Sequence, residues 1–340
     1  MSQTSDYRVR PARADDLDAL YRLALQAGGG LTNLPADRDA LAQRLERSAQ
    51  SFAPEGHPCA LYLLMLEALD PLQAVGTATV FPRIGVEWPF YSYRRIRLSQ
   101  TSVGLGKTTR SEVLHLVNDF DGCAEVGGLF VDPAWRGGRA GRLLARSRYL
   151  FMAQMRERFA DTVVADLRGY QDDAGRSPFW EGLGRHFFDM PFEEADRFNS
   201  LTGNQFIADL MPKHPVYIQL LPPEAQGVIG RPHPAGEPAH RLLLEEGFRD
   251  DGYVDIFDAG PTLHAGIDTL KAVRDSRLAP VAAIADDAEA PLALACAGQG
   301  SAFRAAGGRL RPGPEGPTLS RALAAALGVI EGDEVRHVAF

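Results

Sequence analysis

Six consecutive residues, Arg136 to Gly141, combine residue types that suit the binding of a phosphorylated ligand. Gly137 and Gly138 lack a Cβ, as does Gly141, so the backbone N–H groups of this segment can approach a ligand closely. Arg136 and Arg139 add positive charge beside those amides. Phosphate oxygens suit such donors, above all where the amides begin a helix. The segment therefore predicts a site for a pyrophosphate group.

A strand and a helix must position this segment. Val126, Leu129 and Val131 are apolar and favour a strand, which the turn signal Asp132-Pro133 ends. Apolar residues then follow at helical spacing: Ala140, Leu143, Leu144, Phe151, Met155 and Phe159. The first amides of that helix would face the ligand, where the helix dipole favours an anion. An ordinary strand, turn and helix joined by a glycine-rich connection fits the same pattern.

Two histidines are candidates for proton transfer. His233 lies between Pro232 and Pro234, which exclude a helix and hold the backbone extended. Its near-neutral pKa makes it the best general acid or base in the chain, although a solvated loop histidine fits equally. His214, which follows Lys213, is the rival candidate. The two histidines could instead bind a carboxylate together.

Three carboxylates beside apolar strand residues are candidates for binding a cation. Asp255, Asp258 and Glu125 could each pair with a guanidinium or ammonium group. Each could equally cap a turn or lie at a sheet edge. The string DIFDAGPTL, from Asp255 to Leu263, is more informative than any single member of the group.

The string GLGKTT, from Gly104 to Thr109, ends like a nucleotide-binding P-loop but does not complete the pattern. A P-loop requires a glycine five residues before Gly106, where this chain has Thr101. The preceding residues are also rich in arginine and do not form an apolar strand. We expect a surface loop here.

Composition excludes several classes of protein. The 340 residues are 45% hydrophobic and carry a formal net charge of −8, which is unsuited to nucleic acid. Three scattered cysteines give neither a disulfide framework nor a zinc motif, so we expect no metal. No signal peptide and no apolar run of the ~20 residues needed to cross a membrane is present. We therefore expect a soluble, cytoplasmic protein that does not bind membranes.

Alternating helix and strand patterns predict an α+β fold. The sequence indicates a strand at 7–10, a helix from 14 that Gly28-Gly29-Gly30 ends, a helix at 37–48, and a hairpin of 59–66 with 74–80 around Asp70-Pro71. Another strand is expected at 162–167. The block from Ser177 reads as helix, glycine and strand, and the block from Ala239 repeats that order, which two unrelated units also explain.

Three regions follow from these patterns and from a shift to Ala, Gly and Pro near residue 276. Residues 1–200 form the predicted core, and residues 201–275 form an αβ extension. Residues 276–340 form a small β-rich domain.

The string VDPAWRGGRAGRLL resembles the acyl-CoA pyrophosphate signature of the GNAT N-acyltransferases. Longer strings resemble arginine N-succinyltransferases, in the same order along residues 8 to 275: GGGLTNLPA, LFVDPAWR, VVADLRG, SPFW, FIADLMPKHPVY, EAQGVIGRPHP, EEGF and DIFDAGPTL. This resemblance implies a GNAT-like, mostly antiparallel sheet flanked by helices. It implies that residues 1–200 form a GNAT-like core that binds an acyl-CoA and that the extension at residues 201–275 completes the acceptor site. It also implies transfer of succinyl from succinyl-CoA to the α-amine of L-arginine, with ornithine a further acceptor, in arginine degradation.

The resemblance implies roles for individual residues. His233 takes the place of the family's proton donor, and Leu129 that of its succinyl-CoA contact. Cofactor contacts are then expected at Leu129, Val131 and the Arg136 to Gly141 loop. We expect substrate contacts at Lys213, His214, Asp255 and Asp258.

The chain also departs from the family in places. Arg139 replaces a glycine of the acyl-CoA signature, Gly127-Gly128 replaces a frequent Cys-Thr, and residues after about 280 show no match. A noncatalytic paralogous subunit, or a GNAT acetyltransferase for another amine, is the alternative function. The family also implies a homo-oligomer or a hetero-oligomer with a paralogous subunit.

Overall fold

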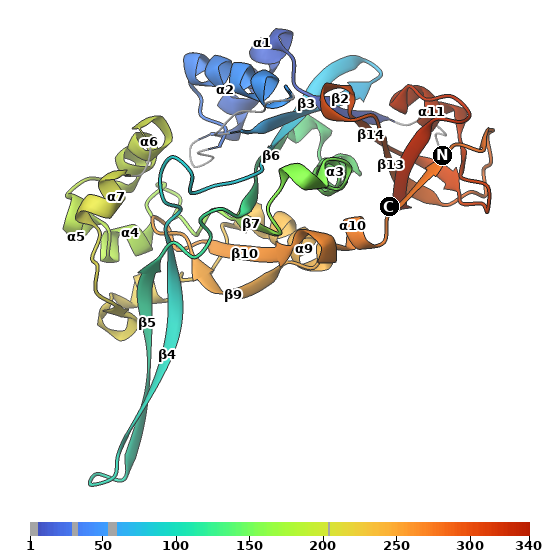
Figure 1. The fold of residues 1–340 in the computed structure, drawn as a ribbon. Coiled ribbons are helices and arrows are strands. Elements are labelled where there is room, and N and C mark those ends of the chain that lie inside the picture. Colours follow the sequence, from blue (N-terminus) through green and yellow to red (C-terminus); the bar gives the residue numbers. More distant parts are fainter. Residues whose placement is uncertain (1–5, 29–32, 54–59, 203–204) are drawn as a thin grey trace.

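A computed structural model describes residues 6–28, 33–53, 60–202 and 205–340 (Figure 1). The predicted helix break at Gly29-Gly30, the adjoining Leu31-Thr32 and the hairpin start at Cys59 lie outside the described residues. The strands are β1 (Tyr7–Pro11), β2 (Tyr62–Leu69), β3 (Leu72–Phe81), β4 (Ser92–Ser102), β5 (Lys107–Val117), β6 (Ala124–Val131), β7 (Thr162–Asp166), β8 (Val216–Tyr217), β9 (Arg249–Val254), β10 (Pro261–Gly266), β11 (Arg277–Pro280), β12 (Ala283–Ile284), β13 (Leu292–Ala297), β14 (Arg304–Arg311), β15 (Thr318–Leu319) and β16 (Glu334–Ala339). The α-helices are α1 (Leu17–Ala27), α2 (Arg38–Ser51), α3 (Ala140–Gln154), α4 (Pro178–Gly182), α5 (Arg185–Phe188), α6 (Phe192–Thr202), α7 (Gln205–Leu210), α8 (Pro223–Gln226), α9 (Glu237–Glu246), α10 (Lys271–Arg274) and α11 (Arg321–Leu327).

One long sheet runs through the molecule in the order β11-β16-β13-β14-β1-β2-β3-β6-β7-β10-β9-β4-β5-β8. Neighbouring strands along this path are antiparallel, apart from the parallel pair β6 and β7. Helices flank the sheet, and the β4–β5 hairpin extends away from the body (Figure 1). The predicted α+β fold with a GNAT-like, mostly antiparallel sheet is confirmed.

The apolar run in β2 reflects burial on both faces of the sheet. Leu64 and Leu66 pack into the core that contains α3, whereas Leu63 and Met65 pack against α1 and α2. Successive strand residues point to opposite faces, so a strand covered on both sides needs an unbroken hydrophobic sequence. The centre of the sheet is therefore buried between two helix-containing cores.

The C-terminal strands continue the main sheet. β14 pairs with β1 on one side and β13 on the other. A separate small core lies around α11 and includes Leu310, Leu319, Leu323 and Val335. Sheet pairing therefore crosses the predicted boundary near residue 276.

Two predictions are confirmed: the hairpin of β2 and β3 around Asp70-Pro71, and the strand β7. The prediction of a strand after Gly184 is wrong. Residues 185–188 form the helix α5, because Phe188 stacks on Trp180 at 5.3 Å within an aromatic cluster. A Cβ on Gly184 would lie 2.3 Å from the Trp180 ring, so this glycine permits helix packing. The two blocks of the proposed repeat consequently differ.

The second block, α9 followed by β9, has the expected order, and Gly247 between them has φ +111°. The P-loop-like string lies at the exposed end of the β4–β5 hairpin. The surface loop expected there is confirmed for Gly104 to Gly106 and is wrong for Lys107 to Thr109, which begin β5 because they pair with the end of β4.

Candidate active site

Strand β6 carries a bulge at its centre. Gly128 and Leu129 lie together opposite Ala78 of β3, since Thr77 pairs with Phe130 and Thr79 with Gly127. Such a bulge takes one residue out of the regular hydrogen-bond ladder and turns the strand. Gly128 has φ +56°, a conformation that favours glycine. The bulge therefore directs backbone groups of β6 away from the sheet.

Beyond its first residues, β6 also separates from its other neighbour. It pairs with β7 only at Ala124 and Glu125. A cavity of about 310 Å³ lies at this point, lined by Gly127 and Gly128 from β6 and by Leu167 after β7. The remaining lining residues are Asn33, Arg44, Phe90, Tyr91, Glu125, Asp166, Arg168, Phe192, Asp196, Asn199, Asp255, Ile256, Phe257 and Asp258.

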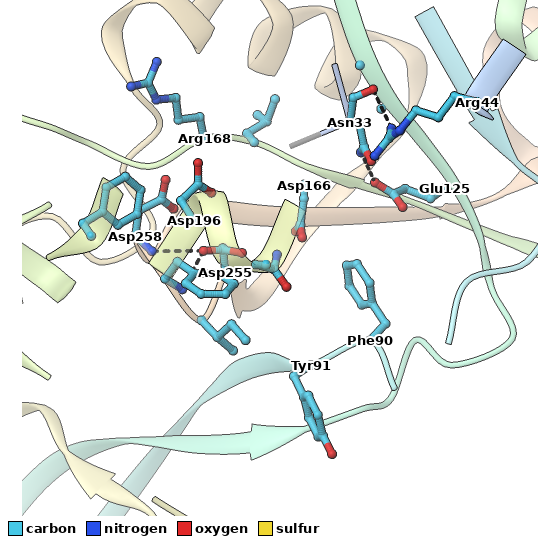
Figure 2. A pocket seen from close by; sticks show the side chains of 17 residues that line it. Asn33, Arg44, Phe90, Tyr91, Glu125, Asp166, Arg168, Asp196, Asp255 and Asp258 are labelled. Carbon is cyan, nitrogen blue, oxygen red and sulfur yellow. Dashed lines mark hydrogen bonds between the residues drawn. The ribbon is translucent and has the colours of Figure 1, made fainter. Parts of the chain in front are cut away.

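Five carboxyl groups share this cavity with two guanidinium groups. Figure 2 shows Asp196, Asp255 and Asp258 on one side, Glu125 with Asn33 and Arg44 on the other, and Asp166 between them. Asn33 donates from Nδ2 to Glu125 Oε1 at 3.0 Å, and Arg44 Nη1 donates to Asn33 O at 2.8 Å. Acidic groups exceed basic ones, so the cavity is suited to a cation.

Burial dominates the protonation of these acids. It raises the pKa of Glu125 to about 7, against the lowering effect of the Asn33 hydrogen bond and the Arg44 charge. Burial and the Asp255 charge raise the pKa of Asp196 to about 6. The same two causes raise the pKa of Asp166 and that of Asp258 well above the usual range. Burial thus favours the neutral forms of these acids, and a bound cation would favour their charged forms.

Backbone amides hold the acid pair Asp255 and Asp258. Asp255 Oδ1 accepts from the N–H of Phe257 at 2.7 Å and of Asp258 at 3.0 Å. Asp258 Oδ1 accepts from Gly260 N at 2.9 Å, and Ala259 between them has φ +55°. A non-glycine residue in this conformation is strained, which is a frequent property of functional turns.

Two glycines allow this turn to cross the segment after β7. A Cβ on Gly260 would lie 1.9 Å from Leu167 O, and one on Gly169 would lie 2.3 Å from Asp258 O. The strings VVADLRG and DIFDAGPTL therefore meet in space, and each supplies a glycine where the two backbones touch.

His233 is bonded to the segment after β7 that takes part in this crossing. Its backbone N–H donates to Arg168 O at 2.8 Å, and its Nδ1 accepts from Ala235 N at 3.1 Å. An Nδ1 that accepts leaves the proton of the neutral ring on Nε2. Burial, and then the Arg168 charge, lower the pKa of His233. At neutral pH the ring is therefore neutral and presents an Nε2–H donor.

The other predicted substrate residues are divided between two places. Asp255 and Asp258 line the cavity, whereas Lys213 and His214 are exposed and do not. Lys213 and His214 precede β8, which pairs with β5 at the end of the sheet. The structure thus brings the aspartates together but leaves Lys213 and His214 outside the group.

The glycine loop follows the end of β6 and leads into α3. Gly137 has φ +88°, and a Cβ on Gly137, Gly138 or Gly141 would meet no atom within 4 Å. The open space around these glycines fits the close approach of a ligand to the backbone. Val131 is buried at the end of β6, and Leu129 is half-buried. The loop has the geometry expected of an anion site at a helix N-terminus.

All three arginines of this region contact other protein groups. Arg136 Nε donates to Val131 O at 2.8 Å and its guanidinium lies 5.1 Å from the centre of the Phe130 ring. Arg139 lies 4.0 Å from Asp6 and over the Phe340 ring, and Arg142 pairs with Glu245. Arg139 is thus directed toward both ends of the chain, so part of its charge is balanced by Asp6.

Comparison with known proteins decides the family. The sequence profile of the arginine N-succinyltransferase beta subunit family matches residues 7–272. The chain belongs to this family. A second profile, that of the C-terminal domain of the same beta subunit, matches residues 277–339. The arginine N-succinyltransferase likeness therefore extends through the part that showed no match by motif.

Individual relatives of the arginine N-succinyltransferase family cover nearly the whole chain. The arginine N-succinyltransferase of Enterobacter sp. (strain 638) is 42% identical over 334 residues, which are 97% of this chain and 96% of the relative. That of Escherichia coli O139:H28 is 40% identical over 332 residues, with the same coverage. The solved arginine/ornithine succinyltransferase subunit AI of Pseudomonas aeruginosa covers 99% of both chains with a TM-score of 0.88 and 35% identity.

Several cavity residues of this arginine N-succinyltransferase family member escaped the sequence prediction. Asp166 ends the strand β7, and a carboxylate directly after an apolar run is a signal that could have found it. Arg44, Asp196 and Asn33 come from helices or connections with ordinary polar sequences. In the part of the chain that the structure describes, no group of three His, Cys, Asp or Glu residues could hold a metal. No helix there is long and apolar enough to span a membrane.

Proposed function

We propose that this protein transfers a succinyl group from succinyl-CoA to the α-amine of L-arginine. The acidic cavity beside the bulge of β6 is the observation that supports this most strongly. Arginine carries two cationic groups, and a guanidinium presents five N–H donors that need several acceptors. Five carboxyl groups in one cavity match that requirement, as does membership of the family.

The order of features along β6 matches the order of groups in the reaction. Glu125 faces the acidic cavity, the bulge at Gly128 and Leu129 follows, and the glycine loop begins five residues after Val131. Leu129 lies about 13 Å from Glu125 along an extended strand. The acceptor, the thioester and the pyrophosphate of the CoA would then lie along one continuous stretch of chain.

The chemistry requires the α-ammonium of arginine to lose a proton before attack. Glu125 is suited to accept it, because its pKa is raised to about 7 and its carboxylate lies in the cavity. The amine nitrogen then bonds to the thioester carbon, and a backbone N–H at the bulge near Leu129 stabilises the oxygen on which negative charge develops. The C–S bond breaks, CoA leaves as a thiolate, and the nitrogen loses its second proton to solvent, which leaves the neutral amide.

His233 is the proposed donor to the departing sulfur. Because its Nδ1 accepts the Ala235 N–H, the neutral ring offers a hydrogen bond from Nε2. A thiol has an ordinary pKa near ~8.5, so a hydrogen-bonded thiolate can leave before it takes up a proton. His233→Ala is expected to lower kcat about 100-fold, because donation in the transition state is lost. Unchanged turnover by that variant would remove this role.

Thiol release by the purified chain tests the proposal. Succinyl-CoA with arginine should give the highest kcat/KM, with ornithine weaker and lysine weaker still. A preference for acetyl-CoA would identify an acetyltransferase instead. Activity without any other protein would exclude the noncatalytic subunit. That alternative is based on Arg139, which replaces a glycine of the acyl-CoA signature.

The proposal also includes the setting of the enzyme. We place it in the cytoplasm, in agreement with Cys123 and Cys296, which are free thiols. We also expect an oligomer, either of this chain or with a paralogous subunit, because the Pseudomonas aeruginosa relative is subunit AI of an arginine/ornithine succinyltransferase. Light scattering of the purified chain at working concentration checks this expectation.

A further inference from the structure

Arg168 is a cation within the acidic cavity that the protein itself leaves incompletely bonded. It lines the cavity, yet among the described residues no carboxylate oxygen lies within 4.0 Å of its guanidinium nitrogens. Its Nε is buried and has no hydrogen-bond partner. A buried donor without a partner is unfavourable in a folded protein and calls for an explanation. A ligand that accepts hydrogen bonds would provide one.

Gln171 beside it has the same property. The side chain is buried, its Oε1 accepts from Arg168 Nη2, and its Nε2 has no partner. The bond from Arg168 fixes which amide atom is the oxygen, so Nε2 remains the free donor. Arg168 lines the cavity, Gln171 contacts it from outside the cavity lining, and each side chain therefore holds an N–H group without a partner. A carboxylate, with two oxygens and about four acceptor sites, is the small group that such donors suit.

The position of Arg168 places these donors between the two functional regions. Its carbonyl oxygen accepts from the His233 N–H, and its positive charge acts on both His233 and Asp196. Arg168 therefore lines the acidic cavity, and its backbone is bonded to the segment that carries the predicted proton donor. An anionic group held here would lie beside the cation in the cavity and close to the reacting atoms.

We propose that Arg168 and Gln171 form the subsite that binds a substrate carboxylate. This inference rests on the proposed function, in which both substrates carry one: the end of the succinyl chain and the α-carboxylate of arginine. Each lies a few bonds from the reacting atoms. Selection for a carboxylate would then come from these two residues and not from Lys213 and His214, which are exposed away from the cavity.

Matched ligand pairs identify which carboxylate is bound. Butyryl-CoA has the chain length of succinyl-CoA without its carboxylate, and agmatine is arginine without its carboxylate. Dissociation constants for all four ligands are measured by calorimetry on the wild-type chain and on Arg168→Met, Arg168→Lys and Gln171→Leu. Arg176→Met is the control, since Arg176 lies in the same connection but is exposed and pairs with Asp172.

The expected result is a selective loss. Arg168→Met should weaken one carboxylate ligand about 10-fold to 100-fold and leave its carboxylate-free counterpart unchanged. Loss for succinyl-CoA assigns the acyl chain, and loss for arginine assigns the acceptor. Gln171→Leu should give a smaller loss for the same ligand. Arg168→Lys keeps the positive charge but lacks Nε, and its dissociation constants replace those of Arg168→Met if that variant does not fold.

Equal weakening of all four ligands, or of none, would overturn the subsite. The proposed function is judged separately, because wild-type turnover of succinyl-CoA with arginine does not depend on these variants. Wild-type protein that binds both ligands but does not turn them over would defeat the function and leave the binding comparison valid.

Discussion

The two halves of the candidate active site are built in opposite ways. The loop from Arg136 to Gly141 is contiguous and largely exposed, and it offers backbone amides to a ligand. The acidic cavity is buried, takes its side chains from well-separated segments, and keeps several like charges together. Backbone donors cannot change their charge, whereas the acids of the cavity change protonation with their surroundings. The loop therefore suits a constant anion, and the cavity responds to the arrival of a cation.

The largest difference between the halves should appear when a methyl group is added to a glycine. Gly260→Ala places a Cβ 1.9 Å from Leu167 O, a backbone atom that cannot move aside cheaply. We expect a loss of at least about 3 kcal/mol in the free energy of unfolding, with activity lost. Gly138→Ala meets no atom within 4 Å and should change stability by less than about 0.5 kcal/mol. Chemical denaturation of both variants measures this, and equal losses would contradict the comparison.

Asp255→Asn should weaken the use of arginine while it increases the stability of the unliganded protein. The amide oxygen can still accept from Phe257 N and Asp258 N, but the charge is lost. We expect kcat/KM for arginine to fall about 100-fold, because a buried charged partner of the substrate is removed. The unliganded protein should become more stable, since Asp255 raises the pKa of Asp166, Asp196 and Asp258 by repulsion.

Thermal unfolding without ligand, together with steady-state kinetics, checks both parts of that expectation. A variant that lost stability and activity together would show that Asp255 is chiefly structural.

Glu125→Gln tests the response of the cavity to pH. A carboxyl group whose pKa is raised on folding makes the folded protein more stable at low pH, where the group is protonated, than at higher pH, where it is charged. That benefit is lost as pH rises from the unfolded pKa near 4.5 to the folded value of about 7. Glutamine does not titrate. The variant should therefore gain stability over wild type by on the order of 2 kcal/mol between pH 5 and pH 8.

The difference in unfolding free energy between variant and wild type, measured by denaturant titration at several pH values, isolates Glu125 from other titrating groups. A difference that does not vary with pH would mean that its pKa is not raised.

Arg142→Ala should have the smallest effect. Its side chain is exposed and pairs with Glu245, so only part of its charge is available to a phosphate. We expect KM for the acyl-CoA to rise two-fold to five-fold at low salt, and the effect to disappear near 0.5 M salt because exposed charges are screened. Asp255→Asn in the buried cavity should keep its effect at that salt concentration.

The sequence revealed the loop because all of its donors are neighbours in the chain. It also revealed Asp255 and Asp258 through a distinctive string, and the hairpin of β2 and β3 through its turn. Arg44 and Asp196 could not be found in this way, because α2 and α6 reach the cavity only through tertiary packing. The error at α5 has a related cause. Phe187 and Phe188 resemble strand residues, but packing against Trp180 determines their conformation.

The pairing of β1 with β14 has a consequence for the order in which the molecule can assemble. β1 is among the first segments to be synthesised, and Val9 pairs with Ala305, nearly the full chain length away. One edge of β1 is therefore left without its partner until synthesis has passed β14. Contacts this distant close slowly, and an open strand edge invites pairing between molecules. The nascent enzyme is thus most exposed to aggregation just before its last strands are made.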